Sequence, residues 1–334
     1  MPSHARTRPC RNAFQLLAAT VFQCLLCGNL YGQTGPALLV EPFPKEQLID
    51  ARGSWVFEDA GHVQGSDENV RLAFYETAGR VRIFPGNLVS PRVGWDLEYI
   101  DLRGSTFSAL PSELTDQSVG VAFPVAQIDN WVFGVALGLG YAGSSPYAEG
   151  TGWYGKGTAV AFRQFSDKDA IVFVLDYNAN RTFLPDVPVP GFAYTRRVSP
   201  QLFYVVGIPV TSVTWKATER LSLEAGWIPI EEFHAAAGYE FVPHLSAFAS
   251  LDYRSDAFRL EGLRGNDRLL FQQRRAELGI RWAPGSDRSS YALTAALGYA
   301  WGQEFSTGFD ARKSDEVADI SDEPYVRLGF EVKF

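Results

Sequence analysis

The chain is poor in cysteine and methionine and, beyond its first residues, in long apolar runs. Its three cysteines, Cys10, Cys24 and Cys27, all fall within residues 1–32. Once that segment is removed, no disulfide framework, cysteine zinc cluster or thiol nucleophile can be built. No later segment approaches the roughly 18 consecutive apolar residues of a membrane-spanning helix. These absences exclude a disulfide-stapled domain and a helical membrane protein.

Residues 1–32 have the pattern of a secretory signal peptide. Three arginines precede an apolar stretch at residues 14–26, and small or turn-prone residues such as Gly28 and Gly32 follow it. We expect cleavage between residues 28 and 33, which would export the mature chain. An N-terminal membrane anchor is the alternative, but the stretch is shorter than the about 20 residues that span a bilayer core.

The overall composition fits a sheet with two different faces. Hydrophobic residues make up 46% of the chain and aromatic residues 14%, yet the mean hydropathy is −0.08. The formal net charge of −8 becomes −11 once Arg6, Arg8 and Arg11 leave with the signal peptide. Such an acidic chain is not expected to bind nucleic acid.

A period of two dominates the chain from about residue 67 to its last residue. Successive side chains of a strand point to opposite faces, so this period predicts strands with one apolar and one polar face. In the last segment the apolar face holds Val326, Leu328, Phe330, Val332 and Phe334, and the other holds Tyr325, Arg327, Gly329, Glu331 and Lys333. The pattern recurs at residues 93–99, 131–141, 221–227, 233–241, 245–253 and 291–301.

These segments predict an all-β fold, a closed antiparallel transmembrane up-and-down β-barrel. Strands of about ten residues that alternate in this way are typical of such barrels. In hydrocarbon every backbone polar group needs a protein partner, so the sheet must close on itself. A soluble β-sandwich or lipocalin-like barrel also alternates. Mid-strand charges such as Arg275, Glu277 and Arg281 disfavour that alternative, because a closed soluble core rarely buries them.

The pattern divides the chain into a signal peptide (1–32), a periplasmic N-terminal segment (33–66) and the barrel (67–334). With Phe334 at the periplasmic rim, the long segments 180–197, 255–266 and 306–322 become outer loops. The apolar parity changes at Pro209, which we attribute to a bulge in one long strand over residues 199–217. We expect 12 or 14 strands, depending on whether residues 69–84 form one strand or a hairpin that turns at Gly79.

The ending Tyr325-Val-Arg-Leu-Gly-Phe-Glu-Val-Lys-Phe334 resembles the C-terminal signature of bacterial outer-membrane β-barrel proteins. The resemblance implies insertion from the periplasm, with Phe334 as the signal that the barrel assembly machinery recognises. Residues 207–229 also resemble an uncharacterised family of predicted outer-membrane barrels. That family has no known function, so it implies no catalytic residues.

The alternation assigns candidate residues to each face of the barrel. The predicted lumen-lining residues are Arg92, Asp96, Glu98, Lys156, Lys216, Glu224, His234, Glu240, Asp252, Arg254, Arg275, Glu277, Arg281, Arg327, Glu331 and Lys333. The predicted aromatic girdles comprise Trp95, Tyr99, Trp131, Tyr141, Trp215, Trp227, Tyr239, Tyr253, Trp282, Tyr299 and Trp301. The inward charges fit either an aqueous pore or a network of opposite charges that fills the lumen.

Motifs for other chemistry are weak. Gly138, Gly140 and Gly143 match G-x-G-x-x-G, but a dinucleotide site needs a helix after the motif, and here a strand pattern and Ser-Ser-Pro surround it. A barrel hydrolase would need a histidine such as His234 at the outer surface, and its parity points inward. The acidic loop residues from Asp310 to Glu323 more often indicate a solvated loop than a metal site. We expect no metal and no cofactor.

The sequence therefore predicts an outer-membrane barrel, in contact with outer-membrane lipid, that passes small solutes without catalysis. A structural or adhesive barrel with a charge-filled lumen is the second hypothesis, and a barrel hydrolase is the third.

Overall fold

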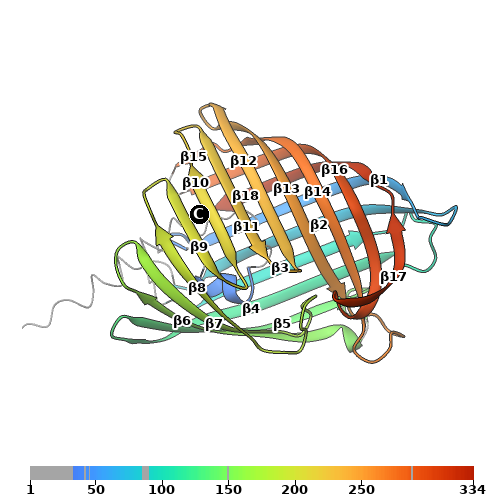
Figure 1. Cartoon of the computed structure of the whole chain (residues 1–334), viewed down its shortest axis with the longest axis horizontal. Helices are drawn as coiled ribbons and strands as arrows, with labels where there is room; N and C mark the ends of the chain where they lie inside the picture. Colours follow the sequence, from blue (N-terminus) through green and yellow to red (C-terminus); the bar gives the residue numbers. More distant parts are fainter. Residues whose placement is uncertain (1–32, 41–42, 45, 85–89, 149, 287–288) are drawn as a thin grey trace, which may run out of the picture.

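The computed structural model describes residues 33–40, 43–44, 46–84, 90–148, 150–286 and 289–334. These residues form an all-β, closed antiparallel barrel with 16 strand positions (Figure 1). The predicted signal peptide, with the three cysteines, lies outside the described residues. Neither helix found in these ranges is long and apolar enough to cross a membrane.

Eighteen strand labels share the 16 positions, because β15 continues the line of β14 and β17 continues that of β18. The bounds are β1 Ile49–His62, β2 Asn69–Arg82, β3 Arg92–Asp101, β4 Glu113–Ile128, β5 Trp131–Gly143, β6 Trp153–Gln164, β7 Asp169–Asn178, β8 Val189–Arg197, β9 Leu202–Ile208, β10 Thr211–Lys216, β11 Leu221–Ile228, β12 Glu232–Val242, β13 Leu245–Phe258, β14 Arg268–Trp282, β15 Gly285–Ser286, β16 Ser289–Asp310, β17 Lys313–Ile320 and β18 Glu323–Lys333. Strands β9, β10 and β11 have only 7, 6 and 8 residues, whereas β16 has 22.

The barrel closes between its first and last strands. β1 pairs antiparallel with β18 from Asp50 opposite Lys333 to Glu58 opposite Tyr325. The last residue extends this seam, because Phe334 N donates to Ile49 O over 3.0 Å. With this closure β1 pairs with both β2 and β18, so neither the first nor the last strand is an open edge. We call the end that holds Phe334 the terminal rim, and the opposite end, with the longer loops, the loop rim.

The expectation of 12 or 14 strands is wrong, and the region around Pro209 is the main reason. Residues 199–217 form the hairpin β9–β10, in which Ser212 lies opposite Val205. Paired residues point to the same face. Because this pairing matches an odd position with an even one, the hairpin changes the apolar parity just as a bulge would.

Two further strands lie where the sequence pattern predicts none in the barrel. β8 occupies the second half of segment 180–197, which we expected to be a loop, and β1 lies inside the expected periplasmic segment 33–66. Residues 69–82, in contrast, form the single strand β2. Gly79 does not turn there; it provides space in mid-strand for the ring of Trp95 on β3.

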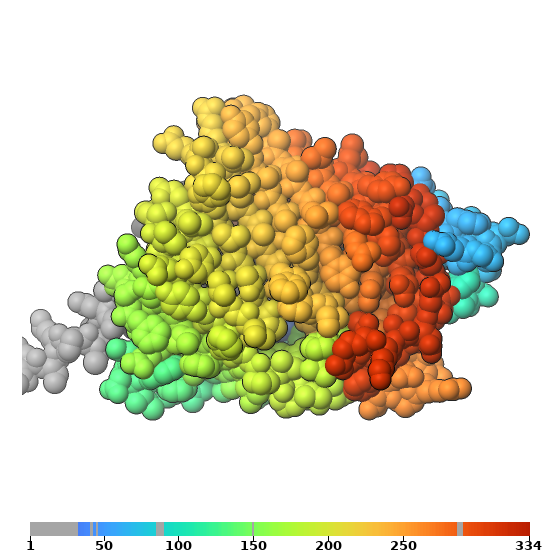
Figure 2. Space-filling view, viewed as in Figure 1, coloured from blue at the N-terminus to red at the C-terminus, as the bar shows by residue number. Residues whose placement is uncertain are grey.

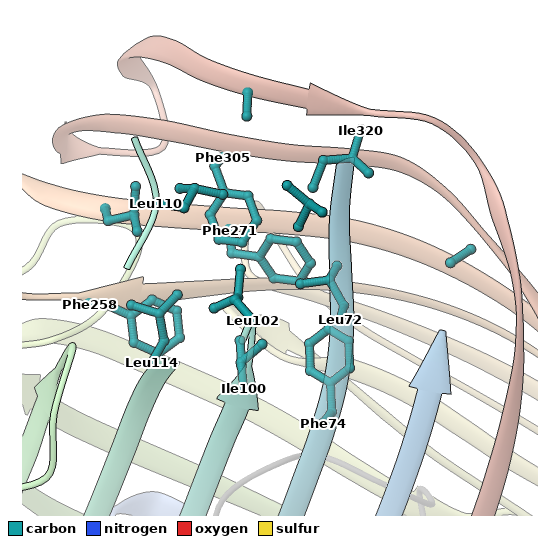
Figure 3. Packing of buried hydrophobic residues seen from close by; sticks show 14 of the residues in the cluster. Leu72, Phe74, Ile100, Leu102, Leu110, Leu114, Phe258, Phe271, Phe305 and Ile320 are labelled. Atoms are coloured by element: carbon teal, nitrogen blue, oxygen red, sulfur yellow. The ribbon is translucent and has the colours of Figure 1, made fainter. Parts of the chain in front are cut away.

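A buried apolar cluster lies inside the barrel towards the loop rim. It joins inward side chains from both walls with residues of the β3–β4 loop, and Figure 3 shows these side chains packed against one another. Its large members are Leu72, Phe74, Ile100, Leu102, Leu110, Leu114, Phe258, Phe271, Phe305 and Ile320. The rings of Phe271 and Phe305 pack in a tilted arrangement, with 4.7 Å between their centroids. This end of the lumen is therefore filled on the β1–β4 and β13–β18 side.

Candidate functional site: the lumen

The centre of the lumen is a polar cavity of about 330 Å³. Six cationic and ten acidic residues line it, which leaves a formal excess of four negative charges. The charged lining residues are Arg52, Glu76, Asp96, Glu98, Asp116, Lys156, Arg181, Glu231, Glu232, Asp252, Arg254, Asp256, Arg275, Glu277, Arg327 and Glu331.

Arg254 of β13 makes ion pairs with three of the carboxylates that line the cavity. Its guanidinium makes ion pairs with Glu76 of β2 and Glu98 of β3 on the facing wall, and Nε donates to Asp256 over 2.7 Å. The same group lies 5.2 Å from the ring centroid of Phe74. Arg254 therefore connects two facing walls of the barrel, next to the apolar cluster that contains Phe74.

A second group of ion pairs and hydrogen bonds lies next to that of Arg254; we call the two groups together the charged belt. Arg275 Nη2 lies 3.4 Å from Glu58 Oε1, and Gln273 donates to the same carboxylate over 2.8 Å. Arg327 Nε donates to Glu277 over 2.8 Å, and the Tyr325 hydroxyl donates to Glu277 over 3.2 Å. These pairs lie on β1, β14 and β18, so that wall is held by complementary charges.

The start of the described chain lies inside the barrel rather than outside it. We call residues 33–40 and 43–44 the lumenal segment; its helix α2 (Pro36–Val40) contacts β3, β4, β5 and β6. Figure 1 shows α2 enclosed by the strands. Gly94 of β3 faces the backbone of Gln33 so closely that a Cβ would collide with it. This close approach requires glycine at that position.

Phe43 anchors the lumenal segment at the terminal rim. Its ring is fully buried, and the guanidinium groups of Arg80, Arg82 and Arg92 lie 4.7, 4.8 and 5.9 Å from its centroid. Arg82 also donates to the Phe43 and Pro44 carbonyls. A guanidinium over an aromatic face is attracted by the ring quadrupole. Three of them close this end of the lumen around one side chain.

The other end of the lumenal segment is hydrogen-bonded to the charged lining. Thr34 N donates to Asp96 Oδ2 over 3.1 Å, and Lys156 Nζ donates to Thr34 Oγ1 over 2.6 Å. Lys156 also donates to Ser118 Oγ over 3.2 Å. The segment thus occupies part of the space that an open pore would need.

The loop between β7 and β8, residues 179–188, crosses the loop rim. Its Ala179 carbonyl accepts a 2.8 Å hydrogen bond from Arg268 of β14, and its Thr182 carbonyl accepts one from Ala311 N over 2.9 Å. Asp186 pairs with Arg268 over 3.1 Å. This β7–β8 loop is therefore fixed to the opposite wall and narrows the mouth of the lumen.

One carboxyl at this mouth has a shifted pKa. Glu231 lies in the turn between β11 and β12, and burial raises its pKa to about 7. The guanidinium of Arg181 lies 3.5 Å away and opposes the rise, as does the backbone N–H of Phe183, whereas Asp176 adds to it. Desolvation disfavours the charged carboxylate. Glu231 therefore titrates near neutral pH.

The predicted lumen-lining residues all point inward, but only some meet at the cavity. Asp96, Glu98, Lys156, Asp252, Arg254, Arg275, Glu277, Arg327 and Glu331 line it, whereas Arg92, Lys216, Glu224, His234, Glu240, Arg281 and Lys333 do not. Arg281 pairs with Glu331 over 3.0 Å. Lys216 and Glu240 are exposed near the terminal rim.

Several lining residues escaped prediction. Glu76, Asp116 and Asp256 line the cavity and have the same inward parity as their strand neighbours, so the alternation was a usable signal for them. Asn180, Arg181, Thr182 and Glu231 come from a loop and a turn, where no periodic signal exists.

His234 is enclosed by carboxylates. Its Nδ1 lies 2.5 Å from Asp252 Oδ1, and its Nε2 lies 3.2 Å from Glu224 Oε1. A general base needs a nitrogen directed at the nucleophile. Both ring nitrogens here face acidic groups, so this arrangement does not resemble a hydrolase triad. His62 and His244 are exposed at the ends of β1 and β12.

The other motifs also lie in ordinary barrel structure. Gly138, Gly140 and Gly143 lie within β5, and the acidic loop at residues 310–323 forms the end of β16, β17 and the start of β18. The described residues contain no group of three or more metal-ligating side chains suited to a metal ion.

The outer surface of the wall is apolar. Leu137, Leu278 and Leu297 are outward side chains exposed by 65%, 70% and 68%. Of the predicted girdle residues, Trp95, Trp131, Trp215, Tyr239 and Trp282 lie towards the terminal rim, and Tyr99, Tyr141, Trp227, Tyr253, Tyr299 and Trp301 lie towards the loop rim. Tyr141 is buried, with its ring 5.5 Å from that of Trp153.

No family model matches the sequence, and no curated protein matches it either. The resemblance of residues 207–229 to a family of predicted barrels therefore stays a prediction. Among solved structures, a Pseudomonas aeruginosa FadL homologue is similar at 9% identity, with 92% of this chain and 95% of that chain covered and a TM-score of 0.42. The toluene transporter TodX of Pseudomonas putida is similar at 9% identity, with coverage of 86% and 89% and a TM-score of 0.33. An outer membrane channel from Pseudomonas putida F1 is similar at 11% identity, with coverage of 87% and 97% and a TM-score of 0.32.

Proposed function

We propose that the chain is an integral outer-membrane β-barrel that lets small polar solutes cross through its lumen without chemical conversion. The observation that carries this proposal is the contrast between its two surfaces. Large apolar side chains are exposed on the outside of β1–β18, while charged and polar groups line a cavity inside. Soluble monomers rarely expose an apolar patch beyond a few hundred Å². A lipid-embedded barrel requires this arrangement.

Both ends of the lumen are narrowed in this conformation. The lumenal segment occupies the terminal end, and the apolar cluster and the β7–β8 loop narrow the other end. Passage of solutes therefore requires the lumenal segment to move. A filled lumen is equally what a structural or adhesive barrel would have, and this second function competes with the first.

Single-channel recording in planar bilayers tests the proposal. The mature protein, refolded in detergent and checked for a mobility difference between boiled and unboiled samples, should give discrete conductance steps. A matched variant that lacks residues 33–44 should give larger or longer openings. If both folded proteins give no steps, passive transport is excluded and the structural barrel is favoured.

The proposed assembly route rests on the C-terminal strand. Phe334 ends the strand line of β18 at the terminal rim, as expected of a signal read by the barrel assembly machinery. Truncation of Phe334 should lower the yield of folded barrel in the outer membrane while leaving export intact, and an unchanged yield would contradict this route.

A further inference from the structure

Several residues that line the cavity carry buried polar atoms without a hydrogen-bond partner, and four of these residues lie together on one side of it. Residues Asn180, Arg181 and Thr182 of the β7–β8 loop and Glu231 of the β11–β12 turn all line the cavity. Strands β9, β10 and β11 are short, so the barrel wall extends less far along the barrel axis on this side. Figure 2 shows a small hollow where the yellow strands meet the yellow-green loop region.

The polar atoms at this place are buried and unsatisfied. Asn180 is 5% exposed and Thr182 is 4% exposed. Among the described residues, Asn180 Oδ1, Thr182 Oγ1, Glu231 Oε1 and Arg181 Nη1 have no hydrogen-bond partner, although Glu231 Oε1 makes a 3.5 Å ion pair with Arg181 Nε. Most buried polar atoms in proteins do have one, so each exception requires an explanation. Four exceptions on one side of one cavity point to a ligand.

The orientation of the Asn180 amide is fixed by its surroundings. Its Nδ2 donates to Asp116 Oδ2 over 3.0 Å and to the Ala257 carbonyl over 2.7 Å. Both partners are acceptors, so the amide nitrogen must face them and Oδ1 points away from both. The loop thus presents a fixed acceptor.

Acceptors dominate the group. Asn180 Oδ1 and the Glu231 carboxylate accept, Thr182 Oγ1 accepts or donates, and Arg181 Nη1 donates. Arg181 is itself ion-paired with Asp176, and its Nε lies 3.5 Å from Glu231. Its charge is therefore compensated locally, and the acidic excess of the cavity remains.

We infer that this group, the mouth site of Asn180, Arg181, Thr182 and Glu231, binds small organic ammonium ions during their passage. The inference deepens the proposed function and rests on it. An ammonium group supplies the donors that the acceptors lack, and it matches the negative excess of the cavity. An anionic solute would find donors only at Arg181 Nη1 and Thr182 Oγ1, and it would place its charge beside the Asn180 and Glu231 oxygens.

Three five-carbon probes of matched length test the charge requirement. Cadaverine is the ammonium probe, pentanediol the neutral one and glutarate the anionic one. In planar bilayers at pH about 8, cadaverine should block the current of the full mature protein at lower concentration than the other two. Equal block by all three probes, or stronger block by pentanediol or glutarate, would overturn the inference.

Two variants test the site itself. Glu231→Gln and Thr182→Val should each raise the half-blocking concentration of cadaverine about tenfold, the usual effect of losing a hydrogen bond to a charged group. Glu219→Gln, which removes an exposed carboxylate from the β10–β11 turn, is the matched control and should leave it unchanged. If both site variants keep the wild-type half-blocking concentration of cadaverine, the binding site lies elsewhere and the inference is wrong.

Calorimetry in detergent separates this inference from the proposed function. If the folded protein gives no conductance, transport fails as a function, yet binding of cadaverine can still be measured. If Glu231→Gln lowers the affinity for cadaverine, the inferred binding site is supported even without transport. No heat of binding from folded wild-type protein, confirmed folded by its mobility before boiling, would remove it.

Discussion

Arg254 on β13 and Glu98 on β3 form an ion pair across the lumen although 156 residues separate them in the chain. The same guanidinium holds Glu76, so one cation compensates two carboxylates on the facing wall. The side chains of Arg254, Glu98 and Glu76 are exposed by only 8%, 16% and 13%. The pairing therefore bridges the barrel among side chains that are largely buried.

Arg254→Met should destabilise the folded barrel by about 3–5 kcal/mol, because it leaves buried carboxylates without their cation. Denaturant titration followed by tryptophan fluorescence measures this loss. A triple variant that also carries Glu76→Gln and Glu98→Gln should recover much of it. If the triple variant is no more stable than Arg254→Met, the loss does not arise from uncompensated charge.

Phe43→Ala should free the lumenal segment, because three arginines at the terminal rim lose the ring that they surround. Single-channel recordings should show a higher open probability than in the unchanged protein. Leu48→Ala is the control, since Leu48 is nearby in the chain but 43% exposed. An equal effect of both substitutions would contradict an anchoring role for Phe43.

Leu297→Arg should cost about 2–4 kcal/mol of stability in a bilayer, the usual loss for a basic residue at mid-depth on the lipid face of a barrel. Leu297 lies opposite Leu278 in the β14–β16 pair, beside the charged belt inside. Folding titrations into lipid vesicles measure the loss. Leu297→Ala should cost much less, and similar losses for the two variants would argue against lipid contact.

Cation preference should rise as the pH passes through about 7, because Glu231 ionises there. Reversal potentials under a salt gradient at pH about 6 and about 8 measure the change, and Glu231→Gln should remove it. The stability has the opposite trend. Between about 4.5 and 7 the folded protein binds an extra proton at Glu231, so stability contributed by this group declines as the pH rises. A preference that does not change with pH would contradict this assignment.

The faces of the strands were predictable because alternation is a local property. Residues such as Arg275 and Leu278 point in and out as the period of two requires. The strand count was not predictable in the same way. β8 contains Pro190, Gly191 and two arginines, which obscure its alternation, and the parity change at Pro209 has two geometric causes that the sequence alone does not separate.

The interior depended on contacts between distant parts of the chain. No local pattern places Phe43 among Arg80, Arg82 and Arg92, or Thr182 beside the turn that holds Glu231. Such contacts follow from closure of the barrel, which sets which strands face each other across the lumen. Periodicity identifies the inward residues, but it does not predict which side chains they contact across the lumen.

The unequal strand lengths have a consequence for the surrounding lipid. A spanning strand needs about 9–11 residues, and β9, β10 and β11 have 7, 6 and 8. On that flank the bilayer must become thinner or the barrel must tilt, each at a modest energetic cost. The protein would therefore be sensitive to acyl-chain length, with shorter lipids relieving the mismatch along one side.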